Sequence, residues 1–215
     1  MQLNPTQNLA VDLLILTFDR SNNSVKIFTP TREDSKKKAL PGILLKHNES
    51  TSDAVERTLE TKTEFSNLNY RLQELPAQTD PNRYPRGHVI SVPILVFLTE
   101  PIIVDNDWSN FEPELELDFD HTHMVNIAFS ILANNWDQHP LPLLLLGENT
   151  TLEETRDLLA HFKPNYTKTL PSNIRNMQFR IGNLKETDSF MANTTKGRPP
   201  RCYKVLANEI KPLYQ

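Results

Sequence analysis

Two long apolar runs place the strongest constraint on the fold of this 215-residue chain. The first is AVDLLILTF at 10–18, and the second is HVISVPILVFLT at 88–99, which is rich in β-branched and aromatic residues. Runs of this kind predict buried β-strands, and the apolar runs of the chain are far too short to span a bilayer as helices. A turn-like DRSNN sequence follows the first run and leads into SVKIF at 24–28, which predicts a β-hairpin.

Two segments with helical patterns accompany these strands. The sequence STS at 50–52 is a helix cap, and the apolar stripe that follows it predicts a helix over 52–63. HTHMVNIAFSILANN at 121–135 carries apolar residues at helical spacing and predicts another helix. Strands around one early helix, closed by a later helix, predict an α/β sandwich in the α+β class over residues 1–140.

The pattern changes after the proline-bearing segment 134–149, which we expect to be an extended boundary between two domains. Thr151 followed by Glu154 is a capping box that opens a helix. PSNIRNMQFRIGNLKE at 171–186 predicts a second helix, and two strand-like segments, SFMANTT and CYKVL, then flank the basic sequence KGRPPR. Two helices and a hairpin in this order predict a small winged helix-turn-helix domain over residues 141–215.

Charge is distributed unevenly along the chain. Of 23 Lys and Arg residues and 27 Asp and Glu residues, ten basic and three acidic ones lie in residues 161–215. The first 160 residues therefore hold 13 basic and 24 acidic residues. A basic C-terminal quarter behind an acidic body indicates a polyanionic partner; the alternative is a basic, solvated tail without one.

Cysteine usage and the first residues bear on the compartment. The single cysteine, Cys202, excludes an internal disulfide and a multi-cysteine metal site, as is typical of a reducing cytoplasm. The sequence MQLNPTQNLAVD has no basic region followed by an apolar stretch, so we expect no signal peptide. We therefore expect a cytoplasmic protein without a membrane partner.

The stretch LPGILLKHNESTSDAVERTLETKTEF at 40–65 has the outline of a catalytic motif. Glu49, Arg57 and Leu59 match the spacing of a Nudix box, in which a glycine-bearing loop shapes a diphosphate site and helix glutamates hold a divalent cation. The rest of the stretch differs from that motif. Ile43 and Glu64 stand where the motif has its first and last glycines. Thr58 replaces the first helix glutamate, and Thr61 and Lys62 replace the glutamate pair. We therefore expect no catalytic residues, no bound metal and no cofactor.

Neighbouring acids do not restore such a site. Glu56, Glu60 and Glu64 share one stripe of the predicted helix at four-residue spacing. Glu60 lies about 200° round the helix from Thr58 and from Lys62, at 3.6 residues per turn. These acids are therefore expected to face away from the metal side, as a solvated acidic surface.

Five further segments occur in an order that a known family shares. They are AVDLLILTF, DPNRYPRGHVISVPILVF, LDFDHTHMVNIA, NIRNMQFRIGNLKET and NTTKGRPPRCYKV. In this order the chain resembles the Nudix-related transcriptional regulators of the NrtR type over nearly its whole length. The resemblance implies a Nudix α/β/α sandwich followed by a small winged helix-turn-helix domain.

The resemblance also implies a function. Members of the family are dimeric repressors or activators that bind operator DNA, often at genes of NAD metabolism or sugar use, and their Nudix-like domain senses ADP-ribose or a related nucleotide. The candidate effector-binding residues are Glu49, Arg57, Arg83 and Arg86. For Arg57 a structural role, bracing the loop, is an equal alternative. His121 and His123 fit a cap or a dimer interface better than metal ligation, because the sequence offers no third ligand.

The candidate DNA-binding residues lie in the last quarter of the chain. Arginine, asparagine and glutamine can make bidentate base contacts, and lysine and arginine bind phosphates. The candidates in the recognition segment are Arg175, Asn176, Gln178 and Arg180, and those in the wing are Lys196, Arg198 and Arg201. Any one of them alone could instead be a solvated surface charge.

Two other functions fit the same sequence. One is a divergent Nudix hydrolase that acts on a nucleoside diphosphate derivative and uses the basic tail for dimerisation or RNA binding. The other is an interaction module whose basic tail docks an acidic partner. Magnesium-dependent turnover of ADP-ribose or ADP-glucose would distinguish the hydrolase from a regulator.

Overall fold

The computed structural model describes residues 8–84, 87–100, 102–180, 182–191 and 199–213. Its main sheet has the strand order β4-β5-β1-β2-β6, and β3 pairs with β1. The two apolar runs form its central strands, β1 at Asn8–Asp19 and β5 at Val89–Leu98, which pair in parallel. The remaining strands of this sheet pair antiparallel and span Ser24–Phe28 (β2), Gly42–Leu44 (β3), Tyr70–Glu74 (β4) and Trp108–Asn110 (β6).

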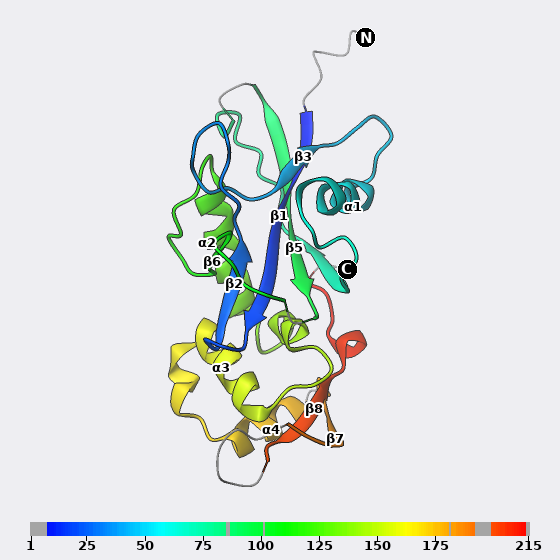
Figure 1. Cartoon of the computed structure of the whole chain (residues 1–215), viewed down its shortest axis with the longest axis vertical. Coiled ribbons are helices and arrows are strands. Elements are labelled where there is room, and N and C mark those ends of the chain that lie inside the picture. The colour runs from blue at the N-terminus through cyan, green and yellow to red at the C-terminus, as the bar shows by residue number, and fades with distance from the viewer. Residues whose placement is uncertain (1–7, 85–86, 101, 181, 192–198, 214–215) are drawn as a thin grey trace.

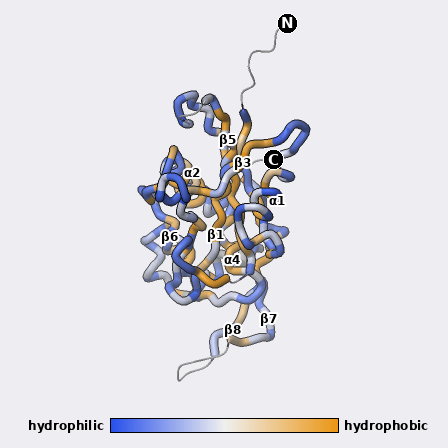
Figure 2. Tube along the Cα trace, turned by 45° about the horizontal axis from the view of Figure 1, so that its top comes forward, coloured by the Kyte–Doolittle hydropathy of each residue, from blue (hydrophilic) through white to orange (hydrophobic). Residues whose placement is uncertain are grey.

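The side chains of β1 alternate between two apolar clusters, one on each face of the sheet. The side chains of Val11, Leu13 and Ile15 pack with helix α1 at Thr51–Lys62. On the other face, those of Leu14, Leu16 and Phe18 pack with helix α2 at His121–Asn134. Because successive residues of a strand point to opposite faces, an unbroken apolar run needs cover on both of them. Figure 1 shows α1 and α2 on opposite sides of the sheet, and Figure 2 shows the hydrophobic segments concentrated in the interior.

Both predicted helices of this sandwich are confirmed to within one residue at each end. Helix α1 begins after Ser50, whose hydroxyl accepts from the amide of Asp53 while the Asp53 carboxylate accepts from the amide of Ser50. This reciprocal pair satisfies two amides that a helix start otherwise leaves unbonded. The predicted strands, helices and their order therefore follow from local sequence signals.

The C-terminal part comprises helices α3 at Leu152–Phe162 and α4 at Pro171–Arg180 and a hairpin of β7 at Leu184–Phe190 with β8 at Arg201–Val205. Short 3-10 helices precede α3 (η1 at Leu141–Leu146), separate α3 from α4 (η2 at Pro164–Lys168) and follow β8 (η3 at Ala207–Glu209). The predicted capping box opens α3, since Thr151 and Glu154 bond to each other's backbone amides. The prediction that the second helix continues to residue 186 is wrong. Gly182 has a φ of 74°, a left-handed conformation that ends helices, and strand β7 begins two residues later.

The segment after α2 is not extended as predicted, because residues 141–146 form the 3-10 helix η1. All six residues of η1, LPLLLL, are buried. They join a core cluster that contains residues of β1 and α2 together with Ile174, Leu184 and Val205 of the C-terminal part. An apolar sequence of this length is stabilised by burial, and here it fills the space between the sheet and α3.

Two polar contacts also link the C-terminal part to the sheet. Arg20, in the turn after β1, donates from Nη2 to the carbonyls of Leu146 at 3.0 Å and Asn149 at 2.8 Å. Near the other end of the chain, the amide of Leu213 donates to Oε1 of Gln73 on β4 at 2.9 Å. No helix within the described residues is long and apolar enough to cross a membrane.

Candidate functional site

A cavity of about 990 Å³ lies beside the N-terminal halves of β1 and β5. Its lining comes from β1, the segments 30–34 and 39–44, the end of α1, the loop before β5, and the start of α2. A volume of this size is sufficient for a nucleotide-sized ligand. The fold therefore brings six separate stretches of the sequence to one site.

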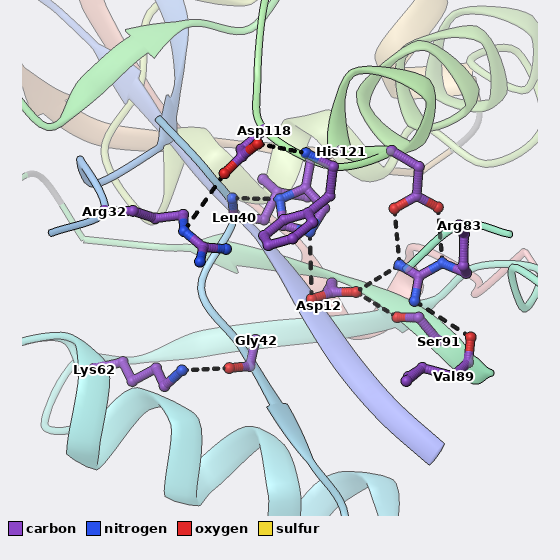
Figure 3. Close-up of polar contacts among 12 residues, drawn as sticks. Asp12, Arg32, Leu40, Gly42, Lys62, Arg83, Val89, Ser91, Asp118 and His121 are labelled. Atoms are coloured by element: carbon purple, nitrogen blue, oxygen red, sulfur yellow. Dashed lines mark hydrogen bonds and ion pairs between the residues drawn. The ribbon is translucent and has the colours of Figure 1, made fainter. Parts of the chain in front are cut away.

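A buried ion-pair network forms one side of this cavity (Figure 3). Arg83 donates from Nε and Nη2 to the two carboxylate oxygens of Asp120, at 2.8 and 2.9 Å, and from Nη2 to Oδ2 of Asp12 at 3.2 Å. Its side chain is only 6% exposed. Ser91 donates its hydroxyl to the same Asp12 oxygen at 2.6 Å. Arg83 therefore holds β1, the loop before β5 and the start of α2 together.

His121 is the first residue of α2, and its ring is buried beside this network. Nδ1 accepts from the amide of Leu40 at 2.9 Å, which leaves the ring proton on Nε2, 3.7 Å from Oδ1 of Asp12. Burial lowers the pKa of His121, since it disfavours the charged imidazolium more than the neighbouring Asp12 favours it. His121 thus fixes the segment before β3 as a neutral group, and α2 has no side-chain cap hydrogen bond at its start.

Gly42 is required where β3 meets β1. A Cβ atom at this position would lie 2.0 Å from Oδ1 of Asp12 and 2.9 Å from the carbonyl oxygen of Val11. Both separations are far shorter than a van der Waals contact, so a side chain here would displace the Asp12 carboxylate. The carbonyl of Gly42 accepts a hydrogen bond from Nζ of Lys62 at 2.6 Å.

An aromatic and cationic wall forms another side of the cavity. The Arg32 guanidinium lies 4.3 Å from the centre of the Phe119 ring, and the Tyr84 ring lies 5.5 Å from that of Phe119. Arg32 also pairs with Asp34 and Asp118, with nitrogen–oxygen distances of 2.5 and 3.5 Å. Phe119 has a φ of 58°, a strained conformation for a bulky residue that occurs preferentially at functional sites.

Of the four predicted effector-binding residues, the three that the structure describes do not lie together. Arg83 lines the cavity, whereas Glu49 and Arg57 lie outside its lining. Arg57 donates from Nε and Nη2 to Glu49, both at 2.6 Å, and from Nη2 to the carbonyl of Leu44 at 2.9 Å. Hydrogen bonds from Arg57 lower the pKa of Glu49 to about 2. These contacts match the alternative in which Arg57 braces the loop, and Arg86 lies outside the described residues.

The residues of α1 that replace the Nudix-box glutamates also differ in position. Thr61 and Lys62 line the cavity, while Thr58 is buried in the core, with its hydroxyl donating to the carbonyl of Ala54 at 2.6 Å. The acids Glu56, Glu60 and Glu64 are exposed and take no part in the lining. Within the part of the chain that the structure describes, no group of three or more His, Cys, Asp and Glu residues is placed to hold a metal ion.

The predicted DNA-binding residues fall on α4 and the hairpin. Arg175 and Asn176 are exposed on α4. Arg201 opens β8, where it pairs with Glu186 and lies with its guanidinium 5.5 Å from the centre of the Phe190 ring. The side chains of Gln178 and Arg180, and the whole of Lys196 and Arg198, lie outside the described residues.

Sequence reasoning missed several residues that line the cavity. They are Asp12, Arg32, Lys62 as a lining group, Tyr84, Phe119 and His121. Asp12 carries the one signal that could have found it, because it is the only charged residue inside the apolar run at 10–18. A charge in a buried strand requires a partner, and Arg83 is that partner.

We expect stability to fall as the pH drops below about 6.5, the ordinary pKa of histidine, in part because of His161. Burial lowers the pKa of His161, although Nε2 donates to the carbonyl of Phe111 at 2.7 Å. The unfolded chain then binds a proton that the folded chain does not, so unfolding is favoured by up to about 1.4 kcal/mol per pH unit. Denaturant unfolding of His161→Gln should show a weaker pH dependence between pH 7 and 5. The exposed His47→Gln should behave like the unaltered protein, and equal slopes for all three would contradict this assignment.

The fold described above is that of a Nudix-like α/β domain followed by a part made of two helices and a hairpin. NrtR from Shewanella oneidensis matches it with a TM-score of 0.76 and 19% sequence identity, over 96% of this chain and 97% of that one. The structure of the same protein complexed with a 27mer DNA matches with a TM-score of 0.75 and 20% identity, over 94% and 95%. A MutT/nudix family protein from Enterococcus faecalis matches with a TM-score of 0.73 and 23% identity, over 94% and 89%.

These likenesses confirm the predicted fold class. They extend over nearly the whole chain in each case, so the C-terminal part is included along with the Nudix-like part. No protein-family model matches the sequence, and no curated protein matches it. The likeness is therefore one of three-dimensional structure.

Proposed function

We propose that this protein is a transcription regulator whose Nudix-like part senses a nucleotide and whose C-terminal part binds operator DNA. The observation that carries the proposal is the likeness in fold to NrtR, which spans both parts and includes a structure of that protein with DNA. A hydrolase of the Nudix type needs only the first part. The second part, which is basic, has the composition of a surface that binds a polyanion.

The DNA-binding surface in this proposal comprises α4 and the β7–β8 hairpin, within residues 141–215. The exposed Arg175 and Asn176 have the side chains that read base edges in a major groove. Gln178, Arg180 and the wing residues Lys196, Arg198 and Arg201 complete the proposed set. We propose a cytoplasmic homodimer that binds two half-sites, since helix-turn-helix proteins commonly pair in this way.

The effector in this proposal is ADP-ribose or a related nucleotide or nucleotide sugar, and it occupies the cavity beside β1 and β5. The cavity has a suitable volume, an aromatic wall at Tyr84 and Phe119, and cationic side chains at Arg32 and Lys62. An aromatic face can stack on a base, and cations can bind phosphates. The site has Thr61 and Lys62 in place of metal-binding glutamates, so we propose that it senses without hydrolysis.

Replacing both wing arginines, in Arg198→Ala/Arg201→Ala, should weaken binding to a DNA duplex from upstream of the protein's own operon. Loss of two phosphate contacts should lower the slope of log affinity against log salt concentration by about 1.8, and lower the affinity about tenfold or more at moderate salt. Fluorescence anisotropy at several salt concentrations measures both quantities. The control is Arg71→Ala, an exposed arginine on β4 in the acidic body. Unchanged affinity and slope in the double variant, with its fold intact, would remove the wing from the proposed surface.

A divergent Nudix hydrolase is the alternative function, because a MutT/nudix family protein shares the fold. Purified protein should leave ADP-ribose and ADP-glucose intact in the presence of magnesium if the proposal is correct. Metal-dependent release of products from either compound, at a rate proportional to the protein concentration, would establish the hydrolase instead.

A further inference from the structure

Lys62, the last residue of α1, extends its ammonium group to the edge of the cavity. Figure 3 shows its Nζ directed at the carbonyl of Gly42, and the two atoms are 2.6 Å apart. We propose that this ammonium is a built-in cation that binds a phosphate of the effector directly and takes the place of a divalent metal ion. The inference rests on the proposed function in that it requires an anionic effector in this cavity.

The charges around the cavity single out Lys62 among the described lining residues. Arg83 is held by the carboxylates of Asp12 and Asp120 and is almost fully buried. Arg32 pairs with Asp34 and Asp118. The hydrogen bond of Lys62, by contrast, goes to a neutral carbonyl, so its positive charge is not neutralised by a carboxylate there. An incoming anion therefore gains more from Lys62 than from either arginine.

The chemistry of the ammonium group suits this role. It has three N–H donors, of which the Gly42 carbonyl takes one, and phosphate oxygens can accept the others. The Gly42 hydrogen bond also fixes the direction of a long and otherwise flexible side chain, which reduces the entropy lost when a ligand binds. An anion at this point would lie between β3 and the end of α1.

The same geometry disfavours a divalent cation. The two lining positions at the end of α1 that a Nudix box fills with glutamates are Thr61 and Lys62, and the Thr61 hydroxyl donates to the carbonyl of Arg57 at 2.6 Å. A magnesium ion needs several oxygen ligands and is repelled by an ammonium group that already occupies the Gly42 carbonyl. Effector binding should consequently be independent of divalent metal.

Isothermal titration calorimetry with ADP-ribose on the full chain tests the proposal. The unaltered protein should bind with the same affinity, within about twofold, in magnesium chloride and in EDTA. Lys62→Met retains the length of the side chain without its charge and should weaken binding about tenfold or more, since a charge-assisted hydrogen bond is lost. Lys62→Arg should retain part of the affinity. The matched control is Lys46→Met, because Lys46 is exposed and lies outside the cavity lining.

The possible outcomes separate this inference from the proposed function. Binding by the unaltered protein that requires magnesium, or that Lys62→Met leaves unchanged, would overturn the role of Lys62 and leave the nucleotide sensor in place. An unaltered, folded protein that binds no ADP-ribose would overturn the effector assignment and the role of Lys62 together. Metal-independent binding that only the Lys62 variants weaken would establish both.

Discussion

Replacing Arg83 by methionine is expected to lower the free energy of unfolding by about 3–5 kcal/mol. Arg83 forms ion pairs with two carboxylates, those of Asp12 and Asp120. Their side chains are only 11% and 20% exposed. Methionine fills similar space but leaves these two negative charges without a cation in a poorly solvated site. Breaking a buried ion pair by removing one partner costs far more than the intact pair contributes, because the remaining charge cannot return to water.

Chemical denaturation followed by far-UV circular dichroism measures this effect, and two further variants isolate its cause. Arg71→Met removes an exposed arginine from the edge strand β4 and should change stability by less than about 0.5 kcal/mol. Adding Asp12→Asn to Arg83→Met removes one of the two orphaned charges and should recover part of the loss. A loss below about 1 kcal/mol in Arg83→Met, or no recovery in the double variant, would show that the network does not stabilise the fold as argued.

This stabilising role changes the interpretation of Arg83 as a ligand-binding residue. Its Nε and Nη2 groups are occupied by carboxylates, and Nη1 lies 3.5 Å from the carbonyl of Val89. The guanidinium therefore has little donor capacity to offer to a phosphate. Arg83 contributes to the proposed effector site chiefly by holding Asp12 and α2 in position, and Lys62 and Arg32 present the accessible cationic groups.

The parts of the fold that could be predicted from the sequence are those set by local rules. Apolar runs identified β1 and β5, and capping residues identified the starts of α1 and α3, because these signals act within a few residues. The three-residue strands β3 and β6 carry no such signal. They exist because tertiary pairing with β1 and β2 supplies their hydrogen bonds, which no short window of sequence contains.

The site was harder to predict, because its residues meet only after folding. The Nudix-box outline pointed to Glu49 and Arg57, which form an ion pair next to the loop rather than in the cavity lining. It also pointed to Lys62 as a lost ligand, and the structure adds that its ammonium faces the cavity from the end of α1. The contact of His121 with Leu40 spans 81 positions and could not be inferred from the spacing of two histidines.

Domain division is the point at which local sequence signals and packing differ most. The changes in charge and pattern predicted two domains, over residues 1–140 and 141–215, with an extended boundary at 134–149. In the structure the apolar segment LPLLLL is buried, and one core cluster combines residues of β1 and α2 with Phe162, Ile174 and Val205. A shared core couples the stabilities of the parts that contribute to it, so the two parts should unfold together.

Truncating Trp136 to alanine is therefore expected to destabilise the whole chain by about 3–5 kcal/mol in a single transition. This residue follows α2, is 1% exposed, and lies with its ring centre 6.0 Å from that of Phe162 on α3. Its removal leaves a large cavity where the sheet domain meets the C-terminal part. Trp136→Phe should cost less, since it retains most of the apolar contact and removes an indole N–H that has no hydrogen-bond partner in the described structure.

Differential scanning calorimetry and circular dichroism, applied to the same variants, test whether the loss is shared. Ile103→Ala is the control, because that side chain is 92% exposed and its truncation should leave the transition unchanged. If the two parts share one core, Trp136→Ala will shift a single transition to lower temperature, with equal calorimetric and van't Hoff enthalpies. Two separate transitions, with only one of them moved by Trp136→Ala, would mean that residues 141–215 fold independently and that the packing at Trp136 does not couple them to the sheet.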